Sequence, residues 1–109
     1  MLPVPTCAAT AAEDERDLSR VHFDIALYRA FAHGFADGCG DLLTDTEWSL
    51  FAEGAILMTL ECGIRFLCDY LSGDTYFCTA YAEHNLVRCR TQLKMVAEME
   101  ESLAQMRAL

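Results

Sequence analysis

The sequence predicts an all-α fold of about four helices. Apolar residues recur at helical spacing in several separate stretches, residues that typically begin or end helices lie between those stretches, and no segment shows the alternation of a β-strand. With 109 residues and 12.2 kDa, the chain has the size of one compact domain. We therefore expect a single helical unit.

Residues 1–12 are predicted to be an extended or disordered lead-in, and residues 13–109 the helical domain. The lead-in contains two prolines and small side chains, with nothing that would become buried. The charged run at 13–20, EDERDLSR, is typical of a solvated turn.

The first helix is predicted from Asp24 to about Cys39. Large apolar side chains recur there every four residues, at Phe23, Leu27, Phe31 and Phe35. Gly38 and Gly40 mark the end of this helix, since glycine readily adopts the left-handed conformation that follows a last helical turn.

A second, short helix is predicted from Asp45 to about Ala52. Thr44 and Glu47 match a capping box, in which each side chain accepts a hydrogen bond from a backbone amide of the first turn. The pair at 53–54, Glu-Gly, is expected to break or bend this short helix before the next helix begins.

The third helix, from Gly54 to Leu71, is the predicted centre of the fold and ends at Ser72-Gly73. It is apolar on nearly every side, which predicts burial on all sides. A domain of this size has little interior in which to hide such a helix, so a second copy or another part of a larger protein is expected to cover it.

The fourth helix is predicted from about Glu83 or His84 to Ala108. Its predicted apolar stripe consists of Leu86, Leu93, Val96, Leu103 and Met106.

Composition argues against several classes of partner. The net charge of −9 and the lack of clustered Lys and Arg disfavour nucleic acid. The charges within the third helix disfavour a membrane span. The N-terminus shows no secretory leader, so we expect a cytoplasmic protein whose six cysteines are reduced. The cysteine spacing predicts no metal site, and no glycine-rich phosphate loop is present.

Three charged residues in the third helix, Glu61, Arg65 and Asp69, are spaced by four and form one stripe. One interpretation is a ladder of ion pairs within the helix, with Glu61 and Asp69 both pairing with Arg65. The other is that the two carboxylates orient Arg65 toward a polar cleft, where its planar guanidinium binds a ligand. The spacing leaves both interpretations open.

The sequence resembles the C-terminal part of N-acetylhexosamine 1-kinases, in the aminoglycoside phosphotransferase and choline kinase superfamily. Relatives in gut bacteria often carry a mucin-desulfating sulfatase label. The resemblance covers residues from about Cys7 to Met106, and its most specific blocks are ECGIRFL at 61–67 and GDTYF at 73–77. Further matching letters are the segment at 10–19, DYL at 69–71, HNL at 84–86, Arg88, and RTQ at 90–92.

The resemblance implies an all-helical, sugar-binding C-terminal subdomain, with Arg65 and Tyr76 as the residues that bind the substrate. In the family, the nucleotide-binding lobe, the catalytic Asp and the magnesium-binding Asp precede this part. The complete enzyme would transfer the γ-phosphoryl group of ATP, with Mg²⁺, to an N-acetylhexosamine. We therefore expect no catalytic residue and no cofactor in this chain, and no activity from it alone.

The alternative function is a stand-alone helical module that dimerises through the central helix. Under the first function, a missing N-terminal lobe covers that helix. Under the second, another copy of the chain does so.

Overall fold

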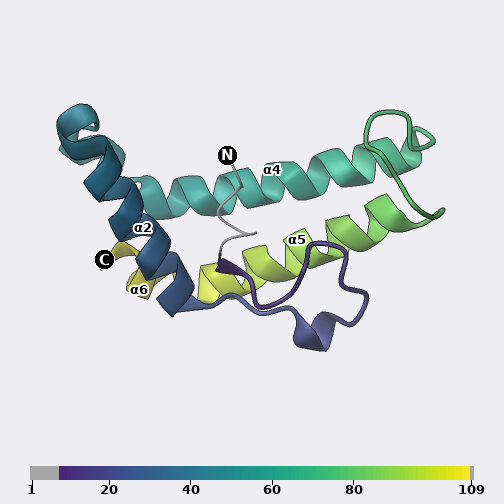
Figure 1. The fold of residues 1–109 in the computed structure, drawn as a ribbon, viewed down its shortest axis with the longest axis horizontal. Helices are drawn as coiled ribbons and strands as arrows, with labels where there is room; N and C mark the ends of the chain where they lie inside the picture. Colours follow the sequence, from purple (N-terminus) through teal and green to yellow (C-terminus); the bar gives the residue numbers. More distant parts are fainter. Residues whose placement is uncertain (1–7, 109) are drawn as a thin grey trace.

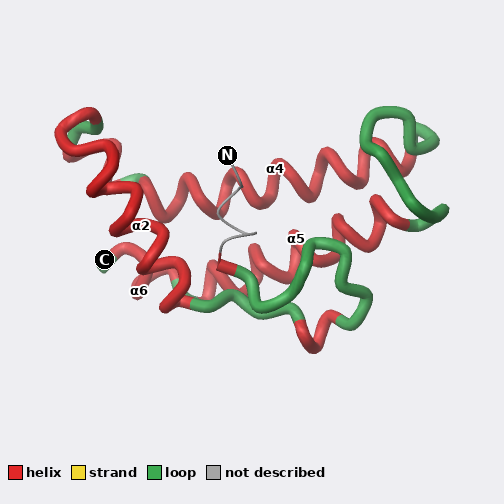
Figure 2. Tube along the Cα trace, in the orientation of Figure 1, coloured by secondary structure: helices red, strands yellow, loops and turns green. Residues whose placement is uncertain are grey.

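The chain folds around two long antiparallel helices. In the computed structural model, which describes residues 8–108, α4 (Phe51–Leu71) and α5 (His84–Glu101) run side by side in opposite directions, and α2 (Ile25–Cys39) lies across one end of the pair (Figure 1). The loop that joins α4 to α5 lies at the other end (Figure 2). The all-α prediction is confirmed, because residues 8–108 form helices, turns and one isolated β-bridge.

Four shorter elements complete the fold. The 3-10 turns η1 (Leu18–Arg20) and η2 (Gly40–Leu42) come before and after α2, and the short helix α3 (Asp45–Ser49) leads into α4. The last helix, α6 (Leu103–Arg107), packs against both α2 and α4. No helix within residues 8–108 is long and apolar enough to cross a membrane.

The predicted helix ends are confirmed where capping chemistry defines them. Thr44 Oγ1 accepts a 3.2 Å hydrogen bond from the amide of Glu47, and the Glu47 carboxylate accepts a 3.0 Å bond from the amide of Thr44. α4 ends at Leu71, and the chain then turns through Gly73 at φ +94° and Asp74 at φ 59°. This left-handed pair turns the chain away from the helix axis.

Two predicted boundaries are wrong. The break before the long helix lies at Leu50, and Gly54 lies inside α4, where its amide donates a 2.8 Å bond to the carbonyl of Leu50. The last predicted helix breaks at Ser102, whose amide donates to the carbonyls of Glu98 and Met99. This break redirects α6 so that Met106 is buried in the core.

α4 and α5 pack closely because α4 presents small side chains at the contact. Its buried residues on this side are Ala52, Ala55, Thr59, Gly63 and Phe66. A Cβ atom at Gly63 would lie only 3.3 Å from the Cβ of Gln92 on α5. The hydroxyl of Thr59 donates a 2.8 Å bond to the carbonyl of Ala55, so its polarity is satisfied within α4.

Within this chain, α4 is not buried on all sides. Leu57, Ile64 and Leu71, on the face away from α5, are 65%, 50% and 74% exposed. The prediction of burial on all sides is therefore wrong for the isolated chain. The reason is its size, because these few elements cover only one face of the central helix.

The end of the predicted lead-in is docked onto the fold. Residues 1–7 of that segment lie outside the described residues. Ala8 is fully buried, and its carbonyl accepts a 2.8 Å bond from the amide of Asp24. Ala9 forms the isolated bridge with Phe23. The prediction that nothing in the lead-in is buried is therefore wrong at Ala8.

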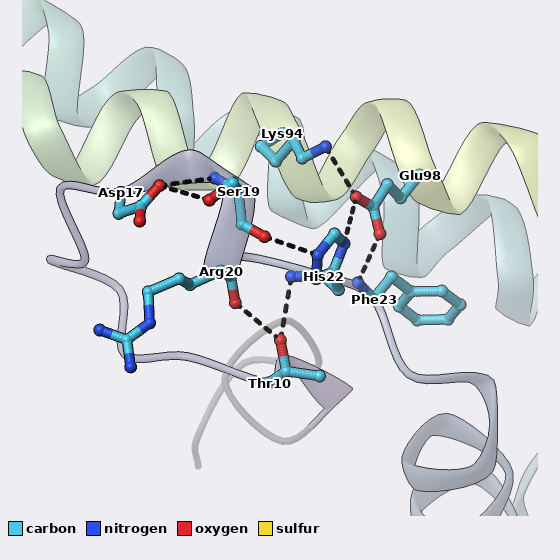
Figure 3. A network of polar contacts seen from close by, with 8 residues as sticks. All are labelled: Thr10, Asp17, Ser19, Arg20, His22, Phe23, Lys94 and Glu98. Atoms are coloured by element: carbon cyan, nitrogen blue, oxygen red, sulfur yellow. Dashed lines mark hydrogen bonds and ion pairs between the residues drawn. The ribbon is translucent and has the colours of Figure 1, made fainter.

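Hydrogen bonds to Glu98 of α5 hold this N-terminal segment against α5 (Figure 3). Its carboxylate accepts a 2.9 Å bond from the amide of Phe23 and lies 3.0 Å from the ring of His22 and 2.9 Å from the ammonium of Lys94. Burial disfavours the charge on Glu98, but these hydrogen bonds outweigh it and lower the pKa of its carboxyl.

Candidate functional site

A cleft of about 390 Å³ opens at the end of α4 and the loop that follows it. It is lined by Arg65, Cys68, Asp69, Ser72, Thr75, Tyr76 and Phe77. Both residues predicted to bind substrate, Arg65 and Tyr76, therefore line one cleft. They come together because the chain reverses at Gly73 and runs back over the last turns of α4.

The guanidinium of Arg65 and two aromatic rings form one wall of this cleft. The Cζ atom of Arg65 lies 5.7 Å from the ring centroid of Tyr76 and 5.7 Å from that of Phe77. Cation–π attraction at this range is worth on the order of 0.5–1 kcal/mol at an exposed site. Arg65 also lies 3.6 Å from Glu61, so the predicted pair of Glu61 with Arg65 is present.

The predicted ion pair of Asp69 with Arg65 is wrong. The carboxylate of Asp69 is buried and turns toward the loop, where it accepts bonds of 2.8 Å from the amide of Tyr76 and 3.0 Å from the amide of Phe77. It accepts a third bond, of 2.7 Å, from the side chain of Asn85 on α5. Asp69 therefore orients the Tyr76 backbone rather than the Arg65 guanidinium.

These bonds also decide the charge of Asp69. Burial opposes ionisation of its carboxyl, but the amide donors of Phe77 and Tyr76, with that of Asn85, stabilise the carboxylate. The net effect lowers its pKa. A carboxylate held charged by fixed donors keeps the loop backbone in one conformation.

Asn85 and Arg88 of α5 complete the support of the loop. Asn85 is fully buried and donates to Asp74 as well as to Asp69. Arg88 donates 3.1 Å bonds to the Asn85 side chain and to the carbonyl of Cys78. Sequence reasoning gave no role to either residue. The sequence does carry an Asn at the start of a helix and a Gly-Asp turn upstream of it. That combination does not identify a contact, because the Asn and the turn come together only when α4 and α5 pack side by side.

Tyr76 and Phe77 have different roles within the loop. Phe77 packs its ring 4.8 Å from that of Phe66, so it anchors the loop to the buried side of α4. Tyr76 is 73% exposed, and its ring stands edge-on to Phe77. The exposed ring offers an apolar face and a hydroxyl beside the Arg65 donors.

The cleft can bind through hydrogen bonds and ring contact. Its lining supplies a guanidinium and hydroxyl groups that can hydrogen-bond to a ligand, and two aromatic rings that can pack against an apolar face. The lining includes no imidazole that could act as a base for Cys68 or Ser72. No group of three or more His, Cys, Asp or Glu within residues 8–108 is arranged to hold a metal ion.

A second cavity, of about 230 Å³, lies at the opposite end of the molecule, where α2 meets the start of α4. Tyr28, Trp48 and Phe51 line it together with Arg107, which pairs with Glu53. Burial, with a smaller effect from the charge of Glu53, raises the pKa of Tyr28 to about 12. These rings also pack against one another, so this cavity is a gap within an aromatic cluster.

A comparison with models of known protein families finds no match to this chain.

Proposed function

We propose that this chain is the sugar-binding, helical C-terminal portion of an N-acetylhexosamine 1-kinase-like phosphotransferase. In this proposal the cleft at the end of α4 receives the acceptor sugar, and Arg65 and Tyr76 bind it. Segments outside these 109 residues supply ATP, Mg²⁺ and the catalytic carboxylates. The proposal keeps the protein in the cytoplasm, where its cysteines remain thiols, as the five described ones are here.

The observation that supports this proposal is the position of Arg65 beside Tyr76 in one open cleft. An N-acetylhexosamine has an apolar ring face for the phenol ring and hydroxyl and carbonyl oxygens for the guanidinium. Asp69 and Asn85 hold the loop backbone, so Tyr76 is partly ordered before any sugar arrives.

The proposal also assigns a limited role to this chain. Phosphoryl transfer depends on positioning and charge stabilisation around a nucleotide and metal ions. The cleft contributes groups that position an acceptor, without groups that activate it. The 109-residue chain alone is therefore expected to show no ATP-dependent sugar phosphorylation.

Binding can be tested by titrating the ¹⁵N-labelled chain with N-acetylglucosamine or N-acetylgalactosamine. We expect weak binding, with a dissociation constant on the order of 10 mM, because one wall of a sugar site gives only part of the affinity. The amide signals of Tyr76 and Phe77 should move together. Glucose, which lacks the acetamido group, should move them less.

Variants of the cleft and a matched control sharpen this test. Tyr76→Ala and Arg65→Ala should abolish the shifts, whereas Arg29→Ala, at an exposed position on α2, should leave them unchanged. Absence of any sugar-dependent shift at 65–77 would overturn the proposal. Equal shifts in the Tyr76→Ala chain would overturn the assigned site.

A further inference from the structure

The outward face of α4 carries an apolar stripe that nothing in residues 8–108 covers. We call it the outer stripe, and it consists of Leu50, Leu57, Ile64, Leu67 and Leu71. Each of these residues is between 36% and 74% exposed. Met58, on one edge of the stripe, is also exposed.

The spacing of the outer stripe is that of a helix packing seam. Leu50, Leu57, Ile64 and Leu71 are each seven residues apart, which returns them to nearly the same side of α4 after two turns. Leu60 and Leu67 lie three residues after Leu57 and Ile64, so the two sets form the a and d positions of two heptads. Leu57 and Ile64 lie on the opposite side of α4 from Thr59 and Phe66, which face α5, and Leu60 and Leu67 lie between the two sides, next to Gly63.

We propose that the outer stripe is the interface of a homodimer, in which α4 packs antiparallel on α4 of a second copy. Under the proposed function, the segments that supply ATP and Mg²⁺ then contact a face of the chain other than the outer stripe. With Met58, the stripe exposes on the order of 500 Å² of apolar surface, so joining two copies buries on the order of 1,000 Å², near the lower limit for a specific interface. Leu57 of one copy then lies opposite Leu67 of the other, and Leu60 lies opposite Ile64. The contact is isologous and closed.

Charge next to the stripe favours the antiparallel arrangement. Glu61 and Arg65 both flank the outer stripe on the same side and pair loosely, at 3.6 Å, within one chain. In an antiparallel two-fold pair, this flank meets the same flank of the second copy. Each Arg65 then lies close to Glu61 of the second copy as well as to its own Glu61, so it offsets the approach of the two Glu61 carboxylates near the two-fold axis. A parallel pair would not allow this arrangement. The interface therefore joins an apolar centre to complementary rim charges.

Sedimentation velocity at about 10 and 100 μM tests the dimer, because interfaces at the low end of the size range are often transient and need a high protein concentration to be populated. Leu57→Lys and Ile64→Lys should weaken association by more than about tenfold, since each places a charge in the apolar centre. The folded state should survive, because both positions are exposed in the single chain. Leu42→Lys is the matched control, since Leu42 is 81% exposed on η2, away from α4, and this variant should dimerise normally.

A charge exchange tests the antiparallel arrangement. Glu61→Arg alone should weaken the dimer, and Glu61→Arg combined with Arg65→Glu should restore it. A monomer at both concentrations, or a dimer that the stripe variants leave intact, would overturn the proposal. The outcome for Leu57→Lys and Ile64→Lys is independent of sugar binding, because neither residue lines the cleft. Arg65→Glu does change a cleft residue, so the charge exchange is read by association alone.

Discussion

The side chain of Asn85 donates a 2.7 Å hydrogen bond to the carboxylate of Asp69. Asp69 lies in the last turn of α4 and Asn85 in the first turn of α5, so this one bond closes the hairpin across the loop at 72–83. The same carboxylate accepts the amides of Tyr76 and Phe77. The shape of the candidate sugar cleft therefore depends on a contact between two residues, of which only Asp69 lines it.

Replacing Asn85 should destabilise the fold strongly for a single polar residue. Asn85→Ala removes two donors and one acceptor at a fully buried position and leaves Asp69 and Arg88 short of partners. We expect a loss of about 2–3 kcal/mol in the free energy of unfolding, measured by urea denaturation. The control is Gln105→Ala, which removes an exposed amide side chain from α6 and should change stability by less than about 0.5 kcal/mol. A loss for Asn85→Ala as small as that of the control would contradict the bridging role.

The lowered pKa of the Asp69 carboxyl predicts how the free energy of unfolding depends on pH. Because this pKa is lowered in the folded state, the Asp69 carboxylate stabilises the fold fully above the unfolded pKa of about 3.9, and this stabilisation is lost as pH falls through the folded pKa. The free energy of unfolding of the wild-type chain should therefore drop more steeply below about pH 4 than that of Asp69→Asn. Other carboxyls contribute equally to both chains and cancel in the difference. Asp41→Asn, at an exposed position, should retain the wild-type slope.

Tyr28 should affect stability at the alkaline end. Its buried phenol has a pKa raised to about 12, because burial and the nearby Glu53 charge disfavour the phenolate. The resulting stabilisation is complete below the unfolded pKa of about 10 and is lost as pH rises through the folded value near 12. The difference in phenolate absorbance between the wild-type chain and Tyr28→Phe isolates this group. A difference that titrates fully at the unfolded value would show that Tyr28 is not buried in solution.

The sequence predicted the local features of this fold better than its long-range contacts. The capping box at Thr44 and the glycine stop after Leu71 were correct, since the residues that decide them lie within a few positions of each other. The spacing of Arg65 and Asp69 could not show which way the carboxylate turns, because the loop donors that compete for it lie seven and eight residues away. That Arg65 and Tyr76 share one cleft was expected from the family resemblance, and their spacing alone gave no such indication.

Burial on α5 illustrates the same limit. The predicted stripe included Leu93, which is 45% exposed, and omitted Asn85, Thr91 and Gln92, which are buried. Val96 and Met106 of that stripe are buried as predicted. Apolarity was misleading at the other positions because α5 is covered on one side by the loop and the N-terminal segment, both of which bring polar backbone groups. Thr91, for example, donates its hydroxyl to the carbonyls of Glu13 and Arg88.

A pair of glycine substitutions tests the close approach of α4 and α5. Both Gly54 and Gly63 lie inside α4, so alanine at either position gains about 0.5–1 kcal/mol from helix propensity. At Gly54 nothing apart from the neighbouring backbone of α4 lies within 4 Å of the new Cβ, and Gly54→Ala should realise that gain. At Gly63 the new Cβ would lie 3.3 Å from the Cβ of Gln92, an atom fixed directly to the α5 backbone, and 3.8 Å from the carbonyl oxygen of Cys89.

Relief of that contact requires α4 and α5 to move apart, which loosens the Thr59 and Phe66 contacts on either side. We therefore expect Gly63→Ala to cost about 1 kcal/mol net, because overpacking of about 1–3 kcal/mol exceeds the propensity gain. Urea denaturation of the two variants at equal concentration measures the difference, which should be about 1.5–2 kcal/mol. Equal stabilisation by both alanines would mean that α4 and α5 are further apart in solution than the contact of Gly63 with Gln92 implies.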